Sequence, residues 1–243
     1  MNVVFALAAV ATALSSMFAL ATAKRAAEGR GPHQLSWAIS LACFAAASAA
    51  LALGASTGWD PGTYRIFYLG GAILSVPWLA LGTVFLLFGG RAGRATRVVL
   101  VFFSGLATGV VFTAALEPIS GTEIPVGKDT FVTAGPRVLA AIASGLGATV
   151  VIVGAVYSAV RLLSDHTTPG RGRLAAANGL VALGTLVLSS GGLIQGAVGH
   201  DEAFALSLAT GIAVIYAGFA VASSVPRPAM LRSARRGTLP AKL

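Results

Sequence analysis

Long uncharged stretches alternate with short charged connections along the whole chain, and every Lys, Arg, Asp and Glu lies in a connection. Each stretch reaches the ~20 residues with which an α-helix crosses ~30 Å of hydrocarbon. The pattern therefore predicts an all-α polytopic membrane bundle with seven transmembrane helices. We expect these helices at residues 1–23, 35–58, 66–89, 98–116, 138–160, 174–199 and 203–225.

The composition agrees with a membrane protein, since 56% of the 243 residues are hydrophobic and 10% are charged. A soluble domain has about 25% charged residues. We expect a single transmembrane domain at residues 1–225, followed by a basic cytoplasmic tail at 226–243. The net charge of +9 does not indicate nucleic-acid binding, because the basic residues flank the spans and act there as topology signals. The expected partners are membrane lipids, with anionic headgroups at the cytoplasmic face.

The basic residues gather on alternate connections, so the chain carries a clear orientation signal. One side holds fourteen of them, and the other side holds three together with six acids. The positive-inside rule then places the N-terminus outside and the C-terminus in the cytoplasm of a bacterial plasma membrane. The fourteen are Lys24, Arg25, Arg30, Arg91, Arg94, Arg97, Arg161, Arg171, Arg173, Arg227, Arg232, Arg235, Arg236 and Lys242.

The first stretch has a second interpretation, a cleaved signal peptide ending at Ala21-Thr22-Ala23. Signal peptides carry positive charge before their apolar region, whereas Met1-Asn2 offers no cationic side chain. Cleavage would also leave Lys24 and Arg25 on the wrong side. We therefore expect the first helix to be retained.

The connections predict how the helices follow one another. Trp59–Arg65 and His200–Glu202 are expected to be tight outer turns, and in the latter we expect solvated charges. Glu117–Arg137 is longer and either covers an outer mouth or connects passively. Helices one to three and five to seven share one plan, which suggests a 3+1+3 arrangement like the parallel repeats of some transporters. The Pro-Gln pair of the sugar-efflux type is absent, so that resemblance is one of topology alone.

The third predicted helix contains Pro77, which leaves the Ile73 carbonyl without its usual donor and should kink the helix. A freed carbonyl within a bilayer is tolerated where it is buried or lines a cavity. In one interpretation, Pro77 only kinks the helix and an aromatic side chain packs beside it. In the other, the segment beside Pro77 lines a cavity. The candidate cavity residues are Ser75, Pro77, Trp78 and Gln195.

Two G-x-x-x-G motifs predict close helix packing, within the bundle or against a protein partner or second copy of the chain. They are Gly105–Gly109 and Gly192–Gly196.

The residues absent from the spans limit the chemistry. No lysine lies in the last span, and His33, His166 and His200 lie on connections. No carboxylate lies within a span, which argues against a proton relay or an ion-coupled pump. We expect no catalytic residue, no cofactor and no metal. The favoured function is binding or translocation of a small neutral or lipid-like molecule without ion coupling; the alternatives are a structural or accessory membrane protein and a lipid-modifying enzyme.

The stretch from Trp59 to Leu87, with its tight outer turn and Tyr-rich, Pro-containing helix, resembles uncharacterised seven-helix integral membrane proteins of high-GC, actinobacterial type. This resemblance implies an integral membrane location and no particular activity.

Overall fold

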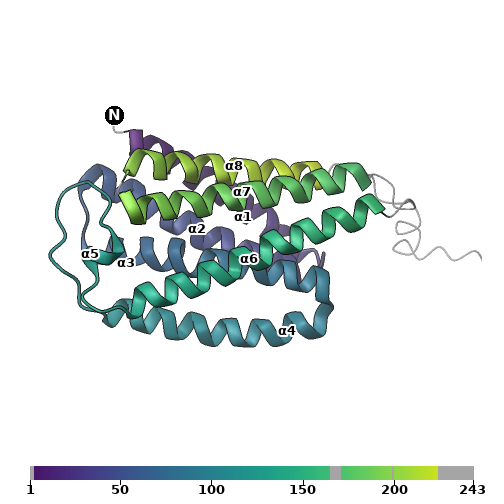
Figure 1. The fold of residues 1–243 in the computed structure, drawn as a ribbon, viewed down its shortest axis with the longest axis horizontal. Coiled ribbons are helices and arrows are strands. Elements are labelled where there is room, and N and C mark those ends of the chain that lie inside the picture. Colours follow the sequence, from purple (N-terminus) through teal and green to yellow (C-terminus); the bar gives the residue numbers. More distant parts are fainter. Residues whose placement is uncertain (1–2, 165–170, 199, 224–243) are drawn as a thin grey trace, which may run out of the picture.

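The chain folds as an all-α polytopic membrane bundle. The computed structural model describes residues 3–164, 171–198 and 200–223, so the predicted basic tail at 226–243 lies outside the described residues. Figure 1 shows the long helices running side by side, with α5 and its flanking segments across one end of the bundle. The elements are α1 (Val3–Ala27), α2 (Pro32–Thr57), α3 (Pro61–Phe67), the π-helix η1 (Tyr68–Leu74), α4 (Ser75–Thr113), α5 (Gly127–Thr130), α6 (Gly135–Ser164), α7 (Arg171–Val198) and α8 (Asp201–Ser223).

Six helices within the described part of the chain are long and apolar enough to cross a membrane. Five of them match single predicted spans. The remaining one, Pro61–Thr113, has 53 residues and covers the third and fourth predicted spans together. At 1.5 Å per residue a straight helix of this length would be about 80 Å long, more than twice the hydrocarbon thickness.

This long helix folds back on itself at Gly89, which has φ 78° and ψ −177° and is the non-helical point inside α4. A residue with a β carbon rarely adopts this backbone conformation. Figure 1 shows the resulting hairpin, with α4 reversing at the end of the molecule opposite α5. We call residues 61–88 the first arm and residues 90–113 the second arm. The predicted connection at residues 90–97 is therefore wrong, because these residues already form the first turns of the second arm.

The first arm begins earlier than predicted. The Asp60 carboxylate caps α3 by accepting the backbone N–H groups of Gly62 (2.8 Å) and Thr63 (3.1 Å). Pro61 occupies the first helical position, where its missing N–H leaves no partner unsatisfied. The predicted turn Trp59–Arg65 is therefore corrected, since its Asp-Pro-Gly signal is a helix start.

The long helices form a closed ring. α1 packs against α2 and α8, α2 against α4, α4 against α6, α6 against α7, and α7 against α8. Around the ring, α1, α2 and the first arm follow one another, as do α6, α7 and α8. α6 packs directly on the first arm, where the Ser144 hydroxyl donates to the Ala72 carbonyl, so the two groups adjoin without the second arm between them. The 3+1+3 arrangement stays a prediction. A large apolar cluster fills the interior, and its large members include Phe18, Phe44, Ile73, Leu208 and Ile212.

The outward faces of the helices carry large apolar side chains. Leu20, Val99 and Phe102 are 72%, 69% and 76% exposed. Apolar surface of this extent is a liability in water, whereas hydrocarbon covers it without cost. The exposed surface therefore agrees with the length and apolarity of the helices.

Candidate functional site

A π-helix interrupts the first arm in front of Pro77. Across Tyr68–Leu74 the backbone follows π geometry, and at its end the Ser75 N–H donates to the Gly70 carbonyl, five residues earlier. The irregularity that the sequence predicts beside Pro77 thus includes seven residues that end three positions before this proline. A π-helix offsets the hydrogen-bond ladder and leaves carbonyls that need other donors.

Serine hydroxyls from two neighbouring helices supply these donors. Ser40 of α2 donates to the Ser75 carbonyl at 2.7 Å, and Ser144 of α6 donates to the Ala72 carbonyl at 2.6 Å. Within the arm, the Ser75 hydroxyl donates to the Gly71 carbonyl at 2.9 Å. The break is therefore held from both sides of the ring by neutral polar groups.

Ser40 and Ser144 were not among the predicted site residues. Each shares its span with other serines, Ser36, Ser48 and Ser56 in the one and Ser158 in the other, so no signal in the sequence singled them out.

Glycines let the neighbouring backbones approach the break. A β carbon at Gly70 would lie 2.7 Å from the Cys43 carbonyl oxygen of α2. One at Gly147 of α6 would lie 3.1 Å from the Pro77 nitrogen. This close approach brings the short serine side chains within hydrogen-bonding distance of the first arm.

Trp78 joins the two arms of the hairpin. Its indole Nε1–H donates to the Ser104 hydroxyl at 3.2 Å, and that hydroxyl donates to the Leu100 carbonyl at 2.7 Å. Trp78 also packs with Leu81, Phe85 and Leu100. Ser75 and Trp78 are thus buried and hydrogen-bonded beside Pro77, and their role in lining a cavity stays a prediction.

The connection between the second arm and α6 is a structured cap over the α5 end of the bundle. Leu116 and Phe131 form an antiparallel bridge, and Ile124 and Phe131 are buried in the core. The Gly121 carbonyl accepts the Trp59 backbone N–H at 3.0 Å. The segment is thus packed onto this end of the bundle, and its role at an outer mouth stays a prediction.

Asp201 fastens this cap to the turn between α7 and α8. One carboxylate oxygen accepts the Ile124 backbone N–H at 2.8 Å, and the other accepts the Gln195 side-chain amide at 2.8 Å. The expectation of solvated charges in this turn is therefore wrong for Asp201. Gln195 bonds to protein here, and its predicted contact with a solute is untested.

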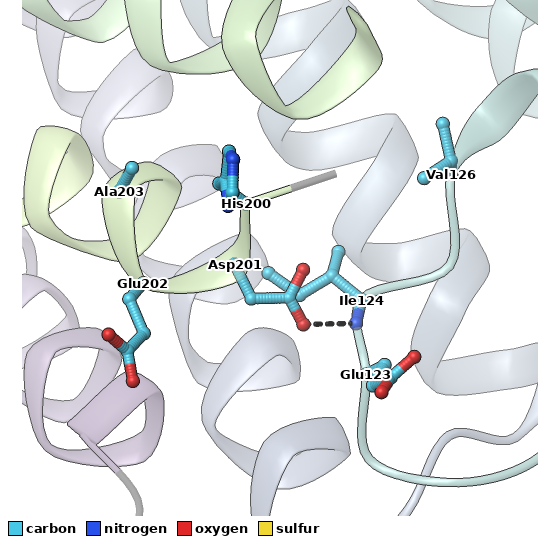
Figure 2. A pocket seen from close by; sticks show the side chains of 7 residues that line it. All are labelled: Glu123, Ile124, Val126, His200, Asp201, Glu202 and Ala203. Carbon is cyan, nitrogen blue, oxygen red and sulfur yellow. Dashed lines mark hydrogen bonds between the residues drawn. The ribbon is translucent and has the colours of Figure 1, made fainter. Parts of the chain in front are cut away.

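A pocket of about 630 Å³ lies between the cap and the start of α8. Figure 2 shows Asp201 bonded to Ile124, with the Glu123 and Glu202 carboxylates pointing away from that bond. Within the described residues, no three His, Cys, Asp or Glu side chains are arranged to hold a metal ion. The pocket is lined by Glu123, Ile124, Val126, His200, Asp201, Glu202 and Ala203.

The predicted packing glycines have different surroundings. No other group lies within 4 Å of a β carbon built at Gly105, Gly109 or Gly192, so open space adjoins all three. Gly196 lies outside the residues whose surroundings the structure describes. A close helix crossing that the prediction missed is between α7 and α8, where a β carbon at Gly184 would lie 2.8 Å from the Gly211 carbonyl oxygen.

No protein-family model, curated protein or solved structure matches this chain.

Proposed function

We propose that the chain crosses a bacterial plasma membrane seven times and binds or translocates a small neutral or lipid-like molecule without ion coupling. The observation that carries this proposal is the helical break at Tyr68–Trp78, surrounded by hydroxyls from other helical segments. π-Helical segments occur frequently at functional sites. The break lies in the first arm, between α2 and α6.

The chemistry around the break favours a neutral ligand. Its polar groups are the hydroxyls of Ser40, Ser75, Ser104 and Ser144, the backbone carbonyls they bond, and the Trp78 indole. A ligand hydroxyl or amide can replace a serine at such a carbonyl with little net change, because one neutral hydrogen bond is exchanged for another. A charged ligand would lose its hydration without gaining a counter-charge.

The hairpin supports the proposed topology. Because Pro61–Thr113 reverses at Gly89, its two arms count as two crossings. Together with the five single spans, they make seven crossings in total. Lys24, Arg25, Arg91, Arg161 and Arg173 then belong to the Gly89 end of the bundle, which we assign to the cytoplasm. The α5 end, with its structured cap, faces outside.

A photoreactive diacylglycerol analogue tests this function in proteoliposomes of the full chain. We expect crosslinks that concentrate on residues 40–44, 70–78 and 144–148, with no change when a potassium gradient with valinomycin sets a membrane potential. The double variant Ser40→Ala/Ser144→Ala should lose these crosslinks. Ser56→Ala should keep them, because the Ser56 hydroxyl is exposed and donates to the Leu53 carbonyl of its own helix. Labelling spread evenly over lipid-facing residues such as Val99 and Phe102 would contradict the proposal.

A structural or accessory role is the second candidate, and the open space beside Gly105 and Gly109 favours it. Two glycines one turn apart on an exposed helix face allow close approach of a partner helix. The mass of the purified complex, with and without Gly105→Leu/Gly109→Leu, tests this role. A stoichiometric partner or second copy should be lost in the variant, and a monomeric parent protein would exclude this role for the motif.

A further inference from the structure

Three exposed arginines follow the Gly89 turn on the second arm. Arg91, Arg94 and Arg97 are three residues apart, so at about 100° per residue they fan over about 120° on one side of the helix. The edge that packs on the first arm is formed by Gly93 and Leu100, which are buried. The guanidinium groups therefore lie beside this packed edge and face away from the ring.

No acid neutralises these three charges within the described part of the chain. None of the three guanidinium groups forms an ion pair or a hydrogen bond there, whereas the Arg30 guanidinium pairs with the Glu28 carboxylate at 2.7 Å. Three unpaired cations on two helical turns create a local positive potential that favours an anion.

An apolar surface continues directly from the arginines on the same side of the second arm. Val98 follows Arg94 by four residues, and Val101 follows Arg97 by four, which places each one turn further along the same face. Val98, Val101 and Phe102 are 57%, 55% and 76% exposed. The face is thus cationic near the turn and apolar beyond it.

We propose that this face is a preferential binding site for an anionic phospholipid. The planar guanidinium forks of Arg91, Arg94 and Arg97 bind the phosphate group, for which their geometry is suited. The acyl chains lie along Val98, Val101 and Phe102. A free phosphate ion would use the cationic half alone, so the continuous apolar half selects the lipid as the source of the phosphate.

Native mass spectrometry of the full chain, titrated in detergent with phosphatidylglycerol or phosphatidylcholine, tests this site. We expect preferential retention of phosphatidylglycerol. The variant Arg91→Gln/Arg94→Gln/Arg97→Gln should bind it roughly a hundredfold more weakly at low salt. Its matched control is Lys24→Gln/Arg161→Gln/Arg173→Gln, which removes three exposed cations at the same end and should change affinity less than about threefold.

Two further measurements separate this site from general attraction of charge. Arg91→Lys/Arg94→Lys/Arg97→Lys keeps the charge and removes the forks, so it should give an intermediate loss with an unchanged melting temperature. Inorganic phosphate should fail to displace the lipid. Equal losses in the two glutamine variants, equal retention of both lipids, or displacement by inorganic phosphate would each overturn the proposal.

Discussion

The side-chain amide of Gln195, near the end of α7, donates a hydrogen bond to the Asp201 carboxylate at the start of α8, with 2.8 Å between Nε2 and Oδ1. The other Asp201 oxygen accepts the Ile124 N–H from the cap. One carboxylate thus joins two helices and the segment that covers them. Its place in the first turn of α8 adds a favourable interaction with the helix dipole.

Replacing Asp201 by Ala should release the cap from the α7–α8 turn. The change leaves the Ile124 N–H and the buried Gln195 amide without their acceptor, so we expect a loss of about 2 kcal/mol in the free energy of unfolding. SDS titration in mixed micelles, followed by circular dichroism, measures this loss. Limited proteolysis should also cut residues 117–134 faster.

Glu202→Ala is the matched control, because Glu202 is the exposed neighbour of Asp201. It should leave both the unfolding free energy and the cleavage rate close to those of the parent protein. Equal effects of the two substitutions would contradict the role assigned to Asp201.

The serine pair that holds the π-helix should contribute to stability as well as to the proposed site. Ser40→Ala and Ser144→Ala each remove one interhelical hydrogen bond, and such bonds contribute about 0.6 kcal/mol on average and at most about 1.7 kcal/mol. We expect each variant to lose stability within this range in SDS titration. The double variant should also exchange the amide hydrogens of residues 70–76 faster, and unchanged exchange there would mean that the hydroxyls do not hold the break.

The pH dependence of the α3 cap follows from the hydrogen bonds to Asp60. The Thr63 hydroxyl, together with the Thr63 and Gly62 backbone N–H groups, donates to the carboxylate and lowers the pKa of Asp60 below its ordinary value of 3.8. A lowered pKa means that the cap stabilises α3 fully above the ordinary pKa, and that this contribution is lost as pH falls through the lower, folded value.

Carbon-13 NMR of the Asp60 carboxylate in micelles should give a titration midpoint below 3.8. Thr63→Val removes the hydroxyl donor and should move the midpoint upward, toward the ordinary value. A midpoint that stays in place in this variant would show that the backbone donors alone set the pKa.

The number and position of the apolar runs could be predicted because the thickness of the bilayer fixes their length. The predicted 138–160 lies inside α6, and the predicted 35–58 starts three residues after α2 begins and ends one residue after it ends. Charge marks where an apolar run ends and not where a helix ends, so the arginines at 91, 94 and 97 looked like a connection, although they lie on a helix.

The interhelical contacts of the candidate site could not be predicted in the same way. Helices that are apolar on all sides have no amphipathic pattern to show which face meets a neighbour. Ser40 therefore could not be paired with the Ser75 carbonyl from spacing alone, since this pairing depends on the rotation and depth of two separate helices. Pro77 did indicate an irregular helix, because proline acts on its own backbone.

Gly89 allows the sharpest test of the hairpin on which the seven crossings depend. Its backbone lies in a region that is almost restricted to glycine, so Gly89→Ala should destabilise the protein by about 1–3 kcal/mol. The matched control is Gly90→Ala, next to the turn but in helical conformation, where alanine is favoured over glycine by about 1 kcal/mol. A β carbon at Gly90 meets only the flexible end of Arg94, at 3.1 Å, so this variant should be neutral or more stable. SDS titration of both variants separates the two positions. If Gly89→Ala were as stable as Gly90→Ala, residues 61–113 would not turn back at Gly89, and the arrangement of seven crossings would have to be abandoned.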